Sequence, residues 1–323
     1  VSMKQGITFG VLAGACWGFI FLPPVLLPEI SPLLLTCGRF ATYGILAAIL
    51  LIPQWRNIAR VWHHRDLLTL IRLSLMSNVF YFLLVAVAVQ QVGIAATSLV
   101  IGLIPVMVPV LGRRDQHAPP FRQLLLPMTA IIAGVVLINL HAIQTSSHQV
   151  TEGKRQMLGI LCAFAALLCW SRYAVENSRC LKKLPYNSNQ WSLLIGLCTG
   201  CISVLLWLIA SIFRFSAVDL SLPEHTQTLF WITNMMLAVV SSWLGYLAWN
   251  LCSRRLPVSL TGQMVVFETL FALLYGFIYS QRIPDLQESA AITLLIGGVM
   301  FTLHYHQHNH GGDVSNTSEV NRS

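Results

Sequence analysis

The sequence predicts an all-α membrane protein of ten transmembrane helices, arranged as two inverted five-helix repeats with both the N- and the C-terminus cytoplasmic. Composition is the first observation behind this prediction. Of the 323 residues, 55% are hydrophobic and 10% are charged, and the mean hydropathy is +0.68. Soluble chains carry about a quarter charged residues, so this balance argues against a soluble enzyme, a coiled coil or a disordered chain. The other two observations are the spacing of the apolar runs and the positions of the basic residues.

Apolar runs long enough to cross a bilayer occur ten times. A helix needs about 20 apolar residues to cross the hydrocarbon core. The expected spans are residues 7–28, 32–52, 67–89, 91–111, 121–140, 157–175, 188–213, 229–250, 257–279 and 288–305. The connections between them are short and leave no room for a soluble domain.

Prolines and a Trp-Gly pair mark several of these spans. The first span contains Trp17-Gly18 and Pro23-Pro24 and lacks a small-residue cleavage site, which favours a permanent, irregular span over a signal peptide. Pro32 begins the second span, and Pro105 and Pro109 lie within the fourth. Proline frees backbone carbonyl groups and permits bending, so these positions are either hinges or static kinks.

The basic residues predict the orientation. With the N-terminus inside, thirteen Lys and Arg residues fall in cytoplasmic segments, four fall on the opposite side and three lie within or at the edge of spans. Cytoplasmic loops carry an excess of Lys and Arg, so both termini are expected in the cytoplasm of a bacterial cell. The net charge of +8 does not indicate nucleic acid, because the cations are spread over short segments between apolar runs.

Residues at constant offsets indicate two related halves. Trp17 and Trp170 each follow a glycine by eleven residues and are 153 residues apart. Tyr81 and Tyr246 are 165 residues apart. Five helices per half is an odd number, so the second half must enter the membrane in the opposite sense, as in carriers that alternate access. The expected divisions are a first repeat at 1–141, a periplasmic linker at 142–156, a second repeat at 157–305 and a disordered cytoplasmic tail at 306–323.

Glu268 is the most informative single residue. Its span begins near Pro257, so at 1.5 Å per residue it lies about 16 Å deep, near the bilayer centre. An ionisable residue there costs at least about 2.5–3.5 kcal/mol and therefore faces a cavity or a partner. Burial favours the uncharged form of a carboxylic acid, which suits a proton-coupling group. The alternative is a structural carboxyl group bonded to a neighbouring helix.

Three arginines lie within or beside spans. Arg39 cannot neutralise itself, so we expect it to hold a substrate carboxylate or to pair with Glu268; the alternative is a packed cation near the interface. Arg172 and Glu176 are spaced i,i+4, which favours a local ion pair over a role in a cavity. Arg72 is expected to be only a cytoplasmic-side anchor.

Aromatic and amide side chains accompany these charges at mid-span, where they need hydrogen-bond partners and can line a pocket. Trp243, Tyr246 and Asn250 are spaced i, i+3, i+7 and share one helix face. For any one such residue, packing is the ordinary role. The residues expected to bind substrate are Trp17, Arg39, Asn78, Tyr81, Trp170, Tyr173, Trp243, Tyr246 and Asn250, with Glu268 as the coupling residue.

Other chemistry is not indicated. The sequence contains no metalloprotease, esterase, P-loop or dinucleotide-binding motif. Cys198 and Cys201 form a C-x-x-C without a second ligand pair, and the alternating histidines at 304–310 are more typical of a solvated tail than of a weak metal site. We expect no enzyme activity, cofactor, metal or nucleic acid. The expected partners are a small-molecule substrate, the lipid bilayer and protons, with the chain as a monomer or homodimer.

These residues resemble the EamA-type members of the drug/metabolite transporter superfamily. The resemblance covers residues 5–305. Within it, the sequence looks most like the YtfF-like bacterial inner-membrane proteins. It is carried by the segments 17–21, 38–39, 78–81, 101–106, 170–179 and 266–270. It implies a carrier, typically an exporter of amino acids, metabolites or drugs, with a central cavity between helices 1–4 and 6–9. Members often have a proline after the carboxyl residue of span nine, where this chain has Thr269, so proton coupling rests on Glu268 itself.

We therefore expect an inner-membrane secondary transporter that exports a small metabolite, such as an amino acid or an amphipathic compound, by alternating access. Glu268 would be the coupling or ammonium-binding group. The alternatives are an uptake carrier for a small polar metabolite and a non-transporting membrane sensor or assembly protein.

Overall fold

The structure, a computed structural model, describes residues 3–112, 150–213, 223–294 and 296–298, together with residues 129 and 133. Within these residues it consists of helices and short connections without a strand, which confirms the all-α prediction. Almost all of the expected fifth span, the first part of the expected linker, the end of the expected tenth span and the histidine-containing tail lie outside the described residues.

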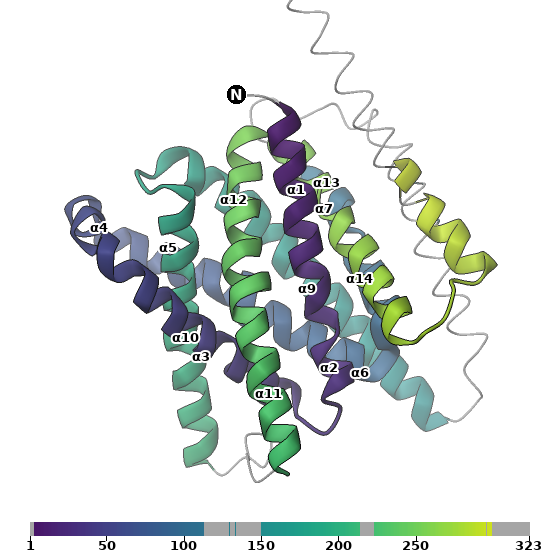
Figure 1. The fold of residues 1–323 in the computed structure, drawn as a ribbon. Helices are drawn as coiled ribbons and strands as arrows, with labels where there is room; N and C mark the ends of the chain where they lie inside the picture. Colours follow the sequence, from purple (N-terminus) through teal and green to yellow (C-terminus); the bar gives the residue numbers. More distant parts are fainter. Residues whose placement is uncertain are drawn as a thin grey trace, which may run out of the picture.

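Helices of several lengths build the described part of the chain (Figure 1). The first expected half contains α1 (Met3–Gly18), η1 (Phe19–Phe21), α2 (Pro23–Leu26), α3 (Pro32–Leu51), η2 (Ile52–Gln54), α4 (Trp55–Val61), α5 (His64–Ser74), η3 (Leu75–Val79), α6 (Phe80–Ile101) and α7 (Ile104–Leu111). The rest contains α9 (Val150–Lys183), α10 (Ser188–Ile212), α11 (Glu224–Met236), η5 (Leu237–Leu244), α12 (Gly245–Arg255), α13 (Val258–Gln263) and α14 (Val266–Tyr279).

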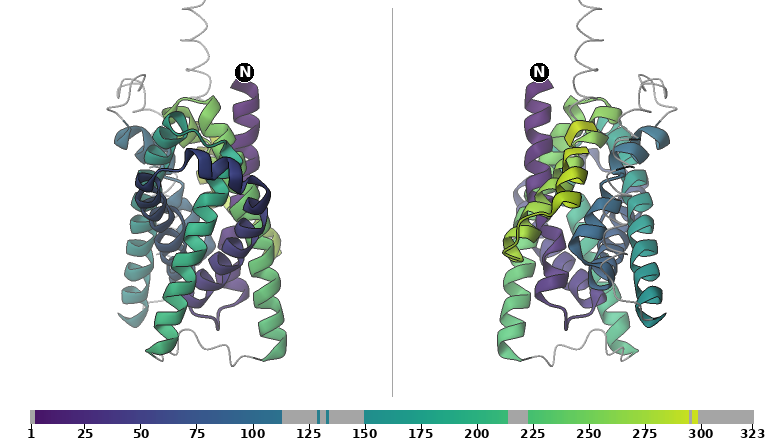
Figure 2. Two further views of the ribbon diagram at one scale, coloured as in Figure 1. Left: turned by 90° about the vertical axis from the view of Figure 1, so that its left-hand side faces the viewer. Right: turned by 90° about the vertical axis from the view of Figure 1, so that its right-hand side faces the viewer.

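Seven described helical segments are long and apolar enough to cross a membrane. They are Met3–Leu26, Pro32–Val61, His64–Ile94, Gly153–Lys183, Ser188–Ile212, Glu224–Arg255 and Leu260–Tyr279. These segments coincide with the expected spans one, two, three, six, seven, eight and nine. In both views of Figure 2 most helices run along one direction, as a membrane-crossing bundle requires.

The expected fourth span is described but divided. Gly93 interrupts α6 with φ of 81° and ψ of 174°, a conformation that residues with a side chain rarely adopt. A turn at Gly102 and Leu103, whose backbone angles remain in the right-handed helical region, separates α6 from α7. The span therefore consists of the second part of α6 followed by α7.

Two pairs of irregular segments recur at related positions. The π-helical turns η3 and η5 lie in spans three and eight, and residues 240–244 of η5 are 165 residues after η3. Spans four and nine are both broken, at 102–103 between α6 and α7 and at 264–265 between α13 and α14. The segments α7 and α13 that flank the breaks contact each other. Interrupted helices of this kind line binding sites in many membrane carriers.

Helices from the first expected half pack directly on helices from the second. The most extensive contacts join α6 to α9, α3 to α10, and α1 to both α12 and α14. Figure 1 shows α1 between α12 and α14. At the crossing of α3 and α10, a Cβ atom on Gly44 would lie 2.6 Å from the Cα atom of Gly200. The two backbones therefore approach as closely as glycine permits.

The connection between α9 and α10 is bonded to residues of α5 and α12. The hydroxyl of Tyr186, between α9 and α10, donates a 2.5 Å hydrogen bond to Asp66 of α5, and Arg254 of α12 donates to the carbonyl oxygen of Tyr186. Asp66 also caps α5 by accepting from the backbone N–H of His63 at 3.2 Å. Burial, and next the hydrogen bond to Asp66, raise the pKa of the Tyr186 phenol well above its usual value. The phenol therefore stays protonated and remains a donor at physiological pH.

The close crossing of α3 and α10 yields a first prediction. Gly44→Ala should destabilise the folded protein by about 1–3 kcal/mol, because the added methyl group must push two helix backbones apart. Gly153→Ala is the matched control, since no atom lies within 4 Å of a Cβ at that helical position. Thermal unfolding of the purified protein in detergent measures both. Equal stability of the two variants would show that the helices do not approach so closely.

Candidate functional site

A small cavity lies among the helices of both halves. Its volume is about 10 Å³, about the size of one water molecule. Its lining comprises Trp17 of α1, Ile20 of η1, Arg39 and Phe40 of α3, Ser77 and Asn78 of η3, Tyr81 of α6, Trp170 of α9, Tyr246 of α12 and Glu268 of α14. Six of the nine expected substrate-binding residues and the expected coupling residue therefore line one cavity.

Glu268 lies in the first turn of α14, directly after the break in span nine, and is 1% exposed. Its Oε1 atom accepts a hydrogen bond of 3.1 Å from the hydroxyl of Tyr81. Its Oε2 atom has no hydrogen-bond partner among the described residues. The carboxyl group is therefore deeply buried and only half satisfied by the protein.

Arg39 is 3% exposed and lies on the same cavity. Its Nε and Nη2 atoms each lie 3.3 Å from the hydroxyl oxygen of Ser242 and donate to it. The guanidinium also lies 4.8 Å from the ring centre of Phe40 and 4.4 Å from that of Phe82, which is the range of cation–π attraction. Among the described residues, Arg39 forms no ion pair with Glu268 or with any other carboxylate. Direct pairing of Arg39 with Glu268 is thus absent in this conformation.

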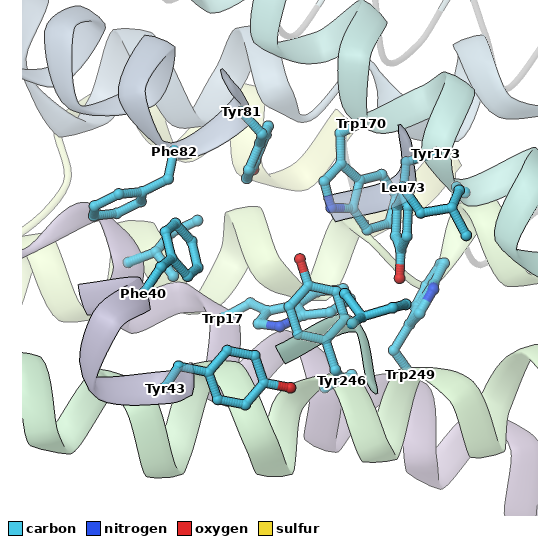
Figure 3. Close-up of a cluster of buried hydrophobic side chains, with 14 of the residues drawn as sticks. Trp17, Phe40, Tyr43, Leu73, Tyr81, Phe82, Trp170, Tyr173, Tyr246 and Trp249 are labelled. Carbon is cyan, nitrogen blue, oxygen red and sulfur yellow. The ribbon is translucent and has the colours of Figure 1, made fainter. Parts of the chain in front are cut away.

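Aromatic rings of the cavity lining gather in one buried cluster, which includes Trp17, Trp170 and Tyr246 (Figure 3). The ring of Trp17 lies 5.5 Å from that of Trp170 and 5.4 Å from that of Tyr246, in edge-to-face arrangements. The indole N–H of Trp17 is held by a 2.9 Å hydrogen bond to the carbonyl oxygen of Ser241 in η5. These contacts explain the small cavity volume: the expected aromatic-walled chamber is present, but its own walls close it.

Asn78 connects three elements around the cavity. Its Oδ1 atom accepts a 2.6 Å hydrogen bond from the hydroxyl of Tyr246, and its Nδ2 atom donates to Thr199 of α10 at 2.9 Å. Asn78 lies in the π-helical turn η3, and Tyr246 is the second residue of α12, which follows the π-helical turn η5. This hydrogen bond therefore joins η3 to the start of α12.

Three expected substrate-binding residues do not line the cavity. Tyr173 lies behind it, with its ring against those of Trp170 and Tyr246. Trp243 donates to Asn189 at 3.0 Å, because the π-helical turns of η5 rotate the residues before Gly245 relative to those after it.

Asn250, the third of these residues, belongs to a separate buried network. It accepts a 3.0 Å hydrogen bond from Asn177 and donates to Ser192 at 2.9 Å. The indole N–H of Trp191 donates to Asn177 at 2.8 Å. This network satisfies the Asn250 amide within the protein.

Sequence reasoning missed several residues of the site. Ser242 holds Arg39, and its signal was the pair of serines at 241–242 within an apolar span. Ser77 could have been found through its neighbour Asn78. Phe40 and Phe82 carry no such signal, because phenylalanine is an ordinary residue in any membrane helix.

The other arginines within spans lie away from the cavity. Arg172 pairs with Glu176 at 2.7 Å, which confirms the expected local ion pair. Arg72 was expected to be only an anchor, and that expectation is incomplete because Arg72 also pairs with Glu176, at 2.8 Å. Both guanidiniums meet the same buried carboxylate, since α5 and α9 contact each other.

A bundle of long apolar helices around a buried cavity lined by an arginine and a glutamic acid is typical of a membrane transporter. The EamA-like transporter family matches residues 4–140 and 157–304. The chain belongs to this family, which is one of membrane transporters rather than enzymes, and the resemblance inferred from its motifs is confirmed.

One relative and one solved structure add detail. The chain is 32% identical over 312 residues to "Inner membrane protein YtfF" of Escherichia coli (strain K12), which covers 93% of this chain and 95% of that protein. The relative and the apolar spans identify a multi-pass inner-membrane protein. A protein of known crystal structure, 18% identical, superposes with a TM-score of 0.67 over 93% of this chain and 98% of that one, and shows the fold alone.

The hydrogen bond between Tyr81 and Glu268 yields a second prediction. Tyr81→Phe should destabilise the protein by about 1–2 kcal/mol, because it leaves both carboxyl oxygens of Glu268 without a protein partner. In a Glu268→Leu background the same substitution should cost less than about 0.5 kcal/mol. Unfolding in detergent of the single and double variants gives the coupling energy. Tyr279→Phe, at an exposed tyrosine, is the control. Additive effects at positions 81 and 268 would contradict the bond.

Proposed function

We propose that the protein exports a small zwitterionic metabolite, such as an amino acid or an amphipathic compound that carries both charges, by alternating access with proton coupling through Glu268. The observation that carries the proposal is a buried arginine and a buried carboxyl group on one cavity. Glu268 and Arg39 are 1% and 3% exposed, and neither forms an ion pair among the described residues.

A zwitterion supplies what each charge lacks. Arginine is always cationic and presents several N–H donors, which suit a carboxylate. Two of these nitrogens share a single hydroxyl at the long distance of 3.3 Å, a weak bond that a substrate carboxylate would replace favourably. An ammonium group would interact with the Oε2 atom of Glu268, which has no protein partner.

The same geometry supports proton coupling. A carboxyl group in an apolar site is favoured in its neutral form, whereas an approaching ammonium group favours the carboxylate. Substrate binding would therefore release a proton from Glu268, and substrate departure would take one up. A carrier whose single carboxyl group binds either a proton or the substrate ammonium group can use an inward proton gradient to drive outward transport of the substrate.

Alternating access requires two halves that move against each other. We propose ten spans in two inverted halves, 1–141 and 157–305, with both termini cytoplasmic. Support comes from the two π-helical turns at an offset of 165 residues, the two broken spans, and the packing of helices across the halves. The excess of basic residues on one side supports the orientation.

The cavity volume identifies the conformational step that the proposal needs. A space of about 10 Å³ holds no amino acid, so Trp17, Trp170 and Tyr246 must separate before substrate enters. The closed state would correspond to the conformation between the two open ones. Irregular backbone at η3, η5 and the breaks of spans four and nine supplies positions where such bending is inexpensive.

Proton coupling yields a third prediction. A thermal-shift screen of amino acids, polyamines, nucleosides and cationic drugs first identifies a ligand. In inside-out vesicles, an imposed pH gradient should drive uptake of that ligand by the wild type and not by Glu268→Gln, which cannot release a proton. Glu29→Gln, at an exposed acid, is the control. Unchanged pH-driven uptake by Glu268→Gln would refute the coupling. Uptake only in right-side-out vesicles would indicate an importer. The absence of flux for every ligand would indicate a sensor.

The role of Arg39 yields a fourth prediction. The wild type should bind a free amino acid at least about tenfold more tightly than its amide, because only the acid offers a carboxylate to the guanidinium. Arg39→Gln should bind both with similar affinity. Calorimetry on the purified protein measures the ratio, with Arg60→Gln, at an exposed position on α4, as the control. If Arg39→Gln and the wild type showed the same preference for the acid over the amide, Arg39 would not contact the substrate carboxylate.

A further inference from the structure

A second hollow, lined by a different set of residues from the central cavity, lies between α5 and α9. Its volume is about 340 Å³. Its lining consists of Thr69, Arg72, Arg172, Glu176, Arg179, Cys180, Lys183 and Leu184. None of these residues lines the central cavity. We name this hollow the α5–α9 groove.

We propose that the α5–α9 groove binds the phosphate headgroup of an anionic phospholipid. Four of its lining residues are cations, namely Arg72, Arg172, Arg179 and Lys183, and one, Glu176, is an acid. Among the lining residues, cations therefore outnumber acids by three. A single phosphate group matches such a site in charge and in its number of acceptor oxygens.

Two of the three arginines in the groove contact Glu176. Arg72 contacts Glu176 through Nη2 and Arg172 contacts it through Nε. The Arg72 and Arg172 side chains are 59% and 54% exposed, whereas that of Glu176 is 8% exposed. The buried carboxylate thus contacts one guanidinium from each of two neighbouring helices, and both arginine side chains remain more than half exposed. Fixed guanidinium pairs lose less conformational entropy when they bind phosphate.

The surface beside the groove favours a lipid over a free anion. Phe164, Leu168 and Arg172 are spaced i, i+4, i+8 on α9 and therefore share one helix face. Phe164 and Leu168 are 43% and 52% exposed, and they continue this face toward the interior of the span. An acyl chain could lie along these residues while its headgroup contacts the cations. Inorganic phosphate would gain nothing from them.

The position along the helices is also that of a headgroup. Lys183 is the last residue of α9, and Arg72 lies two turns inside α5, whose first residue is His64. The groove thus opens at the end of two membrane-spanning segments, where phospholipid headgroups lie. Anionic lipids of the cytoplasmic leaflet attract basic residues at this depth.

Two neighbouring lysines provide a matched pair of variants. Lys182 and Lys183 are both exposed in the last turn of α9, but only Lys183 lines the groove. The full-length protein in neutral detergent is titrated with phosphatidylglycerol, phosphatidylcholine or inorganic phosphate, and binding is followed by native mass spectrometry and thermal unfolding. We expect phosphatidylglycerol to bind and stabilise the wild type, and the other two to do neither. Lys183→Gln should weaken phosphatidylglycerol binding about fivefold, and Lys182→Gln should leave it unchanged.

A third variant tests the arginine pair without unpairing Glu176. Arg172→Lys keeps the charge and can still contact the carboxylate, but it loses the planar fork that binds phosphate. It should fold normally and bind phosphatidylglycerol more weakly than the wild type. Equal binding of phosphatidylglycerol and phosphatidylcholine, or equal losses in Lys182→Gln and Lys183→Gln, would overturn the proposal. Stabilisation by inorganic phosphate alone would assign the groove to a free anion instead.

Discussion

A buried arginine and a buried carboxyl group that share one cavity without touching are the constraint on which the rest of this structure depends. A charge in a membrane bundle is costly unless polar groups or rings compensate it. Arg39 has the hydroxyl of Ser242 and two phenylalanine rings, and Glu268 has one hydrogen bond from Tyr81. Each compensation is partial. Neither side chain is fully satisfied by its own protein partners, which is the basis of the proposed ligand contacts.

The irregular helices make this arrangement physically possible. In a regular membrane helix the backbone N–H and C=O groups bond to each other within the helix. The breaks and π-helical turns instead reposition side chains and carbonyl groups at mid-membrane. Glu268 follows one break, Asn78 lies in one π-helical turn, and the carbonyl of Ser241 in the other holds Trp17. Asn78 of the cavity lining therefore lies in an irregular segment and Glu268 follows one, which is the basis for proposing that these helices bend when substrate enters.

Much of this arrangement could be predicted because the bilayer imposes simple rules on composition. The helical class, most spans and the burial of Glu268 beside a cavity followed from apolar length and from the cost of a buried charge. The local pair of Arg172 with Glu176 followed from helical spacing. The position of Trp243 did not, because a π-helical turn breaks the 3.6-residue period on which the shared face was based. The self-closing of the cavity depends on ring packing between four helices, which no single-helix pattern encodes.

The most direct test counts the protons exchanged when a zwitterion binds. Calorimetric titration of the purified protein in two buffers of different ionisation enthalpy gives the number of protons released per ligand. The account predicts release of about one proton by the wild type and none by Glu268→Gln, because binding converts a neutral carboxyl group into a carboxylate. Tight binding of a zwitterion by the wild type without any proton exchange across the pH range would contradict it.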